Sequence, residues 1–191
     1  MSRIKYGIDL GTTNSAIAEL NKGKSIIKKN LYQDDTTPSC VGFRRGVLVG
    51  KKALSMIKKD REIALSSGKQ NSSNVFQEFK RTMGTDHKYH SELMNKSYSP
   101  QELSSEVLKN LKSQVQEDFR SVIITIPAMF NDSQRAATVE AANLAGFSQV
   151  ELLQEPIAAA TAFGVDEEIK DGYILVFDFG GGTFDVCLIQ V

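Results

Sequence analysis

The first third of the chain alternates short apolar runs with small polar turns, a pattern typical of strands joined by tight turns. An apolar run at 4–10 stops at Gly11, and a second run follows at 14–20. This spacing predicts a hairpin with a small-residue turn. The same alternation predicts strands at 25–28, 41–43 and 47–49. Apolar residues at helical spacing predict a helix at 51–63, and a run of small polar residues predicts a loop at 66–74.

Helical and strand periods alternate in the second half of the chain. Apolar residues recur along one stripe over 100–119, and Ser99, Pro100 and Glu102 give that helix a capping box. A β-branched run at 122–126 predicts a buried strand. We also expect a helix capped by Asp132 or Ser133 that runs through Ala145, with Gly146 as its C′ residue. A further helix is expected over 155–163, and strands over 173–178 and 183–191. Strands followed by alternating helices and strands predict an α/β fold, with a mixed β-sheet flanked by helices.

Composition removes several classes of function. The 191 residues include 23 Lys and Arg and 23 Asp and Glu, so the formal net charge is zero. A broad phosphate-binding face for nucleic acid is therefore not expected. No apolar run approaches the length of a membrane helix, and the N-terminal residues MSRIKYGIDLG lack the apolar core of a secretory signal. We therefore expect a cytoplasmic protein without a membrane partner. The two cysteines, Cys40 and Cys187, lie in apolar runs and predict buried thiols, and no Cys/His spacing predicts zinc.

Two similar turns carry the strongest chemical signal. Residues 7–14, GIDLGTTN, and residues 176–183, VFDFGGGT, both place an aspartate at the end of an apolar run, before glycines and threonine. Glycine permits close backbone approach, successive N–H groups form an anion nest, and a carboxylate can hold hydrated Mg²⁺. Two such turns facing each other would clamp a polyphosphate. Ordinary β-turns remain the alternative, and neither turn matches a P-loop or a dinucleotide-binding fingerprint.

Two further charged residues stay ambiguous on sequence alone. Lys80 stands beside Arg81, and adjacent basic residues are most often a solvated surface pair. Glu155 precedes Pro156 at the start of an alanine-rich helix, where it could serve the helix dipole or orient a water molecule.

Six ordered segments resemble the DnaK-type, seventy-kilodalton heat-shock chaperone family. They are GIDLGTTNSAIAEL, DDTTPS, EFKRTMG, VIITIPAMFNDSQRAAT, LLQEPIAAATAFG and VFDFGGGTFDV. The resemblance implies an actin-like, ribonuclease-H-like ATPase fold, of which residues 1–191 look like lobe I. The inner subdomain would span about 1–37 and 115–191, and the outer subdomain about 38–114. A second lobe and a substrate-binding domain would belong to a longer protein. The chain also ends within an apolar strand, which favours the same expectation.

The resemblance also implies roles for individual residues. Lys80 would reach the γ-phosphate of ATP, Glu155 would position the attacking water, and Thr183 and Asp185 would lie close by. Pro127 and Arg135 match a proline and an arginine that relay the nucleotide state. Potassium ions would sit near the oxygens that hold Mg²⁺. The remaining implied ligands are Asp9 and Asp178 for Mg²⁺, and Gly11, Thr12, Thr13, Asn14, Gly180, Gly181, Gly182 and Thr183 for the phosphates.

Two departures from the family pattern concern the outer surface. The segment between Gly84 and residue 100 is short, which implies a trimmed outer subdomain. Glu151 stands where the family usually has a basic residue that helps to couple J-domain co-chaperones. Such a charge reversal at a docking face lowers affinity and association rate. The implied partners are unfolded peptide clients, a nucleotide-exchange factor and, in spite of Glu151, a J-domain co-chaperone.

The sequence therefore predicts a piece of a chaperone whose ATP binding and hydrolysis control the binding of unfolded peptides. The alternatives are a sugar-kinase-like phosphotransferase of the actin superfamily and a filament-forming or non-hydrolysing ATP-binding module. Because residues 1–191 contain no recognisable adenosine site, we expect weak or absent hydrolysis by this piece alone and ATPase activity in the longer protein.

Overall fold

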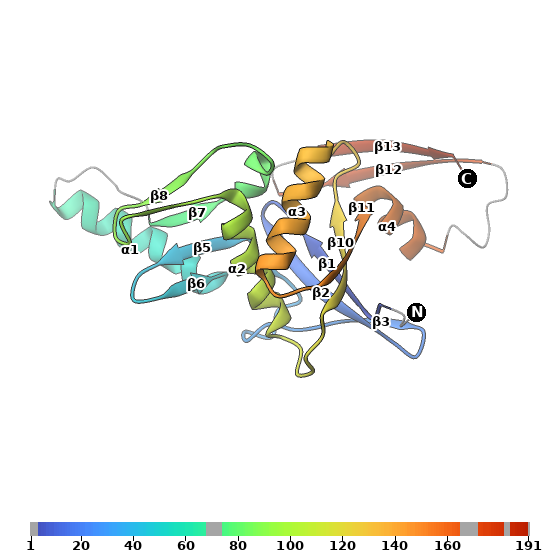
Figure 1. Cartoon of the computed structure of the whole chain (residues 1–191), viewed down its shortest axis with the longest axis horizontal. Coiled ribbons are helices and arrows are strands. Elements are labelled where there is room, and N and C mark those ends of the chain that lie inside the picture. Colours follow the sequence, from blue (N-terminus) through green and yellow to red (C-terminus); the bar gives the residue numbers. More distant parts are fainter. Residues whose placement is uncertain (1–3, 68–73, 165–171, 182–183, 191) are drawn as a thin grey trace.

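The computed structural model describes residues 4–67, 74–164, 172–181 and 184–190. The elements lie in two groups along the long axis of the molecule, with a small sheet at one end and a larger sheet beside it (Figure 1). The order is β1 Tyr6–Leu10, β2 Asn14–Asn21, β3 Lys24–Ile27, β4 Thr37–Pro38, β5 Cys40–Phe43, β6 Val47–Val49, α1 Lys51–Ser67, β7 Val75–Gln77, η1 Phe79–Thr82, β8 Tyr89–Ser91, β9 Lys96–Tyr98, α2 Pro100–Lys112, β10 Ser121–Ile126, α3 Asp132–Leu144, β11 Gln149–Gln154, α4 Glu155–Ala162, β12 Tyr173–Phe179 and β13 Phe184–Gln190.

The larger sheet is mixed, as the sequence predicts. Its strands follow the order β11-β10-β1-β2-β3, and β4 pairs with β2. Strands β1, β10 and β11 run parallel, whereas β2 and β3 run antiparallel to their neighbours. The predicted first hairpin is confirmed by the register between β1 and β2, in which Ile8 faces Ile17. The carboxyl ends of β1, β10 and β11 therefore meet at one edge of the sheet.

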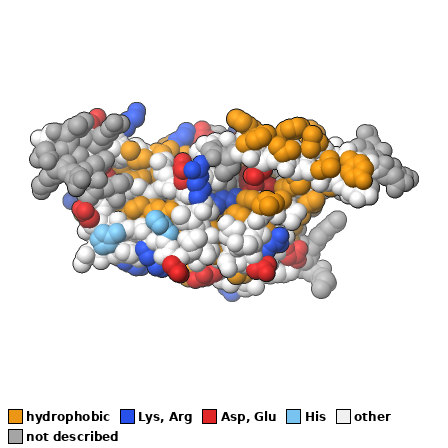
Figure 2. All heavy atoms as spheres, turned by 90° about the horizontal axis from the view of Figure 1, so that it is seen from above, with side chains coloured by type: hydrophobic (Ala, Val, Ile, Leu, Met, Phe, Trp, Pro, Cys, Tyr) orange, Lys and Arg blue, Asp and Glu red, His pale blue; other side chains and the backbone are white. Residues whose placement is uncertain are grey.

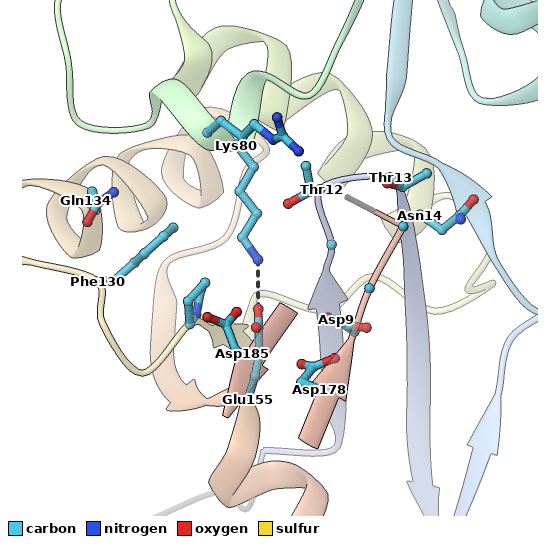
Figure 3. Close-up of a pocket in the computed structure, with 15 residues that line it drawn as sticks. Asp9, Thr12, Thr13, Asn14, Lys80, Phe130, Gln134, Glu155, Asp178 and Asp185 are labelled. Carbon is cyan, nitrogen blue, oxygen red and sulfur yellow. Dashed lines mark hydrogen bonds and ion pairs between the residues drawn. The ribbon is translucent and has the colours of Figure 1, made fainter. Parts of the chain in front are cut away.

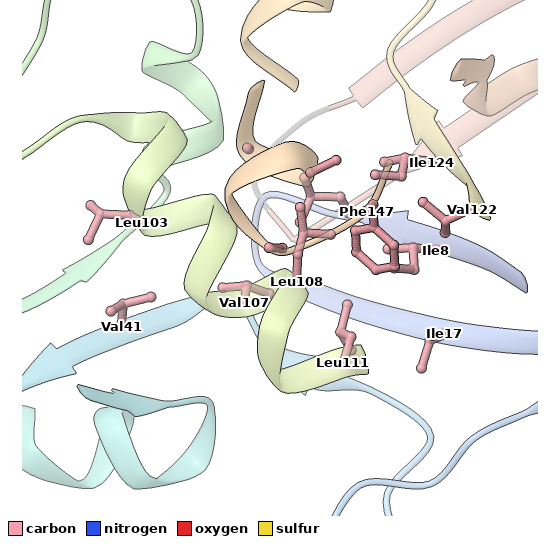
Figure 4. Close-up of a cluster of buried hydrophobic side chains, with 14 of the residues drawn as sticks. Ile8, Ile17, Val41, Leu103, Val107, Leu108, Leu111, Val122, Ile124 and Phe147 are labelled. Atoms are coloured by element: carbon pink, nitrogen blue, oxygen red, sulfur yellow. The ribbon is translucent and has the colours of Figure 1, made fainter. Parts of the chain in front are cut away.

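Helix α2 packs between β2 of the larger sheet and β5 of the smaller sheet (Figure 4). Its stripe of Leu103, Val107, Leu108 and Leu111 is completely buried. The capping box predicted at Ser99 is present, because its side chain accepts from the Glu102 backbone while the Glu102 carboxylate accepts from the Ser99 backbone. Burial of this stripe and the capping box together stabilise the helix.

The predicted end of that helix at residue 119 is wrong, because α2 ends at Lys112. The apolar residues that the helical pattern places beyond Lys112, Val115 and Phe119, therefore lie outside the helix. Phe119 packs on Tyr6, with ring centroids 3.9 Å apart, and the Tyr6 hydroxyl donates to Glu117 over 2.7 Å. These contacts draw residues 113–120 toward the sheet, so tertiary packing overrides the helical period.

The smaller group contains the predicted hairpin of β5 and β6, extended by β7 into a three-stranded sheet under α1. Cys40 is buried there, and burial raises the pKa of its thiol to about 12. Cys187 is only partly buried, so the prediction of two buried thiols holds for one of them. Most of the loop expected at 66–74 lies outside the described residues.

The final hairpin, β12 and β13, forms a separate two-stranded sheet rather than joining the larger one. It lies beside α4, along the upper edge of the molecule (Figure 1). None of the helices in the described part of the chain is long and apolar enough to cross a membrane.

Candidate functional site

The first glycine turn joins β1 to β2 and needs glycine at its start. A Cβ atom on Gly11 would lie 2.1 Å from the Asn14 carbonyl oxygen, closer than any side chain permits. Ser39 holds the turn from behind, because its hydroxyl donates to the Gly11 carbonyl over 2.7 Å and its backbone N–H donates to the Thr13 carbonyl over 2.8 Å. Sequence reasoning missed Ser39, although the residue belongs to the segment DDTTPS that carries the family resemblance.

The second glycine turn follows β12 and contacts the first. A Cβ atom on Gly181 would lie 2.7 Å from the Thr13 hydroxyl oxygen. The two turns therefore approach each other as closely as a glycine backbone allows. Two of the predicted phosphate ligands in this turn, Gly182 and Thr183, lie outside the described residues.

Lys80 is buried, so the interpretation as a solvated surface residue is wrong. It lies in the short helix η1, which Glu78 introduces with a left-handed backbone at φ 54°. The Lys80 side chain is 8% exposed, and its Nζ donates to Glu155 Oε1 over 2.7 Å. Figure 3 shows this side chain reaching down toward Glu155. The spacing of 75 residues between the partners explains why sequence alone could not decide the role of either.

Glu155 is the first residue of α4 and follows the last residue of β11. Burial raises the pKa of its carboxyl group, and the negative charges of Asp9 and Asp178 raise it further, whereas Lys80 acts in the opposite direction. The net direction is upward. Glu155 therefore has the environment of a carboxyl group that can hold or release a proton closer to neutral pH than a free glutamate.

Three more carboxylates surround the same space. Asp9 lies on β1 and accepts a hydrogen bond from the Thr125 hydroxyl over 2.9 Å. Asp178 and Asp185 face each other directly across β12 and β13. Like charges at opposed positions of a sheet repel, and a bound cation would remove that cost. Within the described residues, no three His, Cys, Asp or Glu side chains gather closely enough to hold a metal ion by direct ligation.

All these elements meet around one cavity of about 310 Å³ (Figure 3). It opens where β1, β10 and β11 end, which is where open α/β sheets bind ligands. Figure 2 shows acidic and basic side chains together in a hollow of the upper face. Its lining includes most of the predicted site: Asp9, Gly11, Thr12, Thr13, Asn14, Lys80, Pro127, Glu155, Asp178, Gly180, Gly181 and Asp185.

The cavity also contains residues that sequence reasoning did not single out. Arg81, Phe130 and Gln134 complete its lining. Arg135, by contrast, is not part of the lining; its Nε donates to the Phe130 carbonyl oxygen over 3.1 Å. Phe130 and Gln134 flank the start of α3, whose N-cap is Asn131 rather than the predicted Asp132 or Ser133. The segment NDSQ offers several possible caps, and only the backbone path decides between them.

A mixed α/β sheet whose parallel strands end at a cavity lined by glycine turns defines a class of proteins that bind anionic ligands at those ends. Comparison with known sequences makes the class specific. The family model of the Hsp70 protein matches residues 5–191, and the chain belongs to this family. Its fold is accordingly the actin-like ATPase fold that the sequence predicts.

Two curated relatives support the assignment. The chain is 42% identical over 192 residues to proteins named "Chaperone protein DnaK" from Thermosipho melanesiensis and from Thermosipho africanus. The alignment covers 97% of this chain and 30% of each relative, so the chain spans about a third of their length. These matches do not favour a sugar-kinase-like phosphotransferase or a filament-forming module.

Proposed function

We propose that this chain is the phosphate-binding and magnesium-binding lobe of an ATP-hydrolysing Hsp70 chaperone. The observation that carries the proposal is the single cavity in which two glycine turns, a buried lysine and four carboxylates converge. Donors on one side and acceptors on the other match a magnesium polyphosphate, which presents negative oxygens and a hydrated cation together.

The carboxylates fit a hydrated magnesium ion better than a directly ligated one. Mg²⁺ keeps several water molecules and uses one or two protein carboxylates, which agrees with the lack of a tight ligand cluster in the described residues. Asp9 and Asp178 would hold that ion through water, and potassium ions would occupy nearby oxygens. The ion would neutralise phosphate charge and offset the repulsion between Asp178 and Asp185.

The roles of the chain's own groups follow from position and charge. The turn containing Gly11, Thr12, Thr13 and Asn14 would bind phosphate oxygens through backbone N–H and hydroxyl groups, as would the glycine turn at 180–183. Lys80 would transfer its hydrogen bond from Glu155 to the γ-phosphate. Glu155, thus released, would orient the attacking water and accept its proton, while Asp185 assists nearby.

In the longer protein, ATP binding and hydrolysis would control the binding of unfolded peptides by a domain outside residues 1–191. The inner subdomain would comprise about 1–37 and 115–191, and the outer one, trimmed, about 38–114. We propose a cytoplasmic location, a nucleotide-exchange factor and a J-domain co-chaperone as partners. Glu151 is exposed on β11, so its acidic side chain is available to weaken or redirect that last contact.

The proposal is tested by calorimetric titration of the chain with MgATP and with magnesium triphosphate. Because the described lining supplies phosphate ligands, we expect weak binding of both compounds with affinities within a few fold of each other. Gly181→Ala should abolish it by pushing Thr13 out of place, whereas Gly46→Ala, whose Cβ would meet open space, should leave it unchanged. Failure of both compounds to bind at millimolar concentration, or equal binding by the Gly181 variant, contradicts the proposal.

Hydrolysis is tested in the longer protein. Lys80→Ala is expected to abolish ATP hydrolysis while leaving nucleotide binding largely in place, since a point charge at the γ-phosphate matters most in the transition state. Residues 1–191 alone should show weak or absent turnover. Normal turnover by the Lys80 variant would refute the assigned role, and micromolar binding of MgADP by residues 1–191 would refute the expected lack of an adenosine site.

A further inference from the structure

The ammonium group of Lys80 has a second neighbour besides Glu155. Its Nζ lies 5.7 Å from the centroid of the Phe130 ring, within the range of a cation–π interaction. Figure 3 shows the Phe130 side chain beside the end of the lysine, on the wall of the cavity. The lysine is thus held between a carboxylate and an aromatic ring.

Phe130 is itself held by its backbone on both sides. Its N–H donates to the Pro127 carbonyl oxygen over 3.2 Å, which closes the turn that follows β10. Its own carbonyl oxygen accepts from Arg135 Nε over 3.1 Å. Pro127 lines the cavity, whereas Arg135 lies one turn into α3. These two hydrogen bonds therefore link the Phe130 backbone to Pro127 on the cavity wall and to Arg135 on α3.

We propose that Phe130 is a positioning residue, whose ring keeps the Lys80 ammonium in the cavity and whose carbonyl oxygen ties that position to Arg135. This inference rests on the proposed function in so far as Lys80 acts on the γ-phosphate. It adds a physical connection through one residue: the Phe130 ring contacts the Lys80 ammonium, and the Phe130 backbone carbonyl oxygen accepts the Arg135 hydrogen bond.

The experiment measures how fast Lys80 reacts with acetic anhydride in the ligand-free chain, relative to Lys22 in the exposed turn between β2 and β3, by mass spectrometry. Phe130→Leu keeps an apolar side chain but removes the π face. We expect Lys80 to react about three times faster in that variant, as the loss of a modest cation–π interaction implies. Phe130→Tyr retains the face and should restore the original rate. Phe163→Leu, the same change at a ring that is 90% exposed, is the control and should have no effect.

The connection to Arg135 is tested by a double-mutant cycle. Arg135→Leu removes the donor to the Phe130 carbonyl and should also speed the labelling of Lys80. In the Phe130→Leu background it should add nothing, because the ring that transmits the effect is gone. Unchanged labelling in Phe130→Leu, failure of Phe130→Tyr to restore the rate, or additive effects of the two leucine substitutions would overturn the proposal. The assay contains no nucleotide, so its failure is distinguishable from a failure of phosphate binding.

Discussion

The pair formed by Lys80 and Glu155 is the residue-scale feature on which the site depends most. Both side chains are largely removed from water, and the carboxylate also faces the charges of Asp9 and Asp178. A buried pair of this kind contributes little net stability, because desolvation of both charges offsets their attraction. The pair is important for function instead. Lys80 can exchange Glu155 for a phosphate oxygen, and Glu155 can exchange Lys80 for a water molecule.

The sign of the Glu155 pKa shift gives a direct test of that environment. Burial is the largest cause of the upward shift, and Lys80 is the largest influence opposing it. Lys80→Ala should therefore raise the pKa of Glu155 further above its ordinary value, so the carboxyl group takes up its proton at higher pH than in the unmodified chain. A carboxyl ¹³C NMR titration measures this. A pKa that stays the same or falls in the variant contradicts the arrangement.

At the scale of elements, the segment after η1 is pressed against the start of α3. Gly84 has φ +75°, and a Cβ atom there would lie 2.8 Å from the backbone of Ser133 and Gln134. Gly23 has φ +79° but faces open space, so it is a matched control. We expect Gly23→Ala to cost about 1–2 kcal/mol for its left-handed backbone alone.

Gly84→Ala should cost at least about 1 kcal/mol more than that control, since α3 must also move. Denaturant unfolding of the two variants measures the difference. Lys80 lies in η1, just before this segment, so in the longer protein the Gly84 variant should also lose ATP hydrolysis while the Gly23 variant keeps it. Equal losses of stability in the two variants would show that the segment after η1 does not pack tightly against α3.

The start of α3 gives a second test at this scale. Its N-cap, Asn131, accepts from the Gln134 backbone N–H over 2.9 Å, and the Gln134 side chain accepts in return from the Asn131 N–H. Asn131→Ala should lower the free energy of unfolding by about 1 kcal/mol, and Ser133→Ala should change it little. Thermal unfolding of both variants decides which residue is the cap; the reverse ranking would place it at Ser133.

The elements also show what the sequence can and cannot specify. Local signals sufficed for the first hairpin, for α2 with its capping box and for the strand at 121–126. Strand β11 was missed because QVELLQ alternates weakly, and its pairing with β10 supplies what the pattern lacks. The site was predicted through motifs. Ser39, Phe130 and Gln134 were not, because each acts through contacts between distant segments that no local pattern encodes.

At the scale of the whole molecule, one surface departs from the rest. The outward face of β12 and β13 carries seven large apolar side chains, each 51–84% exposed: Tyr173, Leu175, Phe177, Phe179, Phe184, Val186 and Leu188. Figure 2 shows apolar side chains gathered over this part of the molecule. Seven neighbouring exposed apolar side chains are unusual on a protein surface in water and favour association. The opposite face carries Asp178 and Asp185, which line the cavity, so the hairpin lies between the cavity and this apolar face.

That surface leads to a prediction about the chain in solution. Because these seven side chains are each more than half exposed on one face, two copies pairing through this face would remove neighbouring apolar surface from water, which favours self-association. We expect the weight-average mass from light scattering to rise with concentration, and anilinonaphthalene sulfonate to bind. Phe177→Lys, at 64% exposure in the middle of the face, should suppress both effects, whereas Phe163→Lys, at the exposed end of α4 and outside the two strands, should suppress neither. A constant monomer mass without dye binding would mean that this face is covered in solution, and equal effects of the two substitutions would show that general charge rather than the hairpin face governs association.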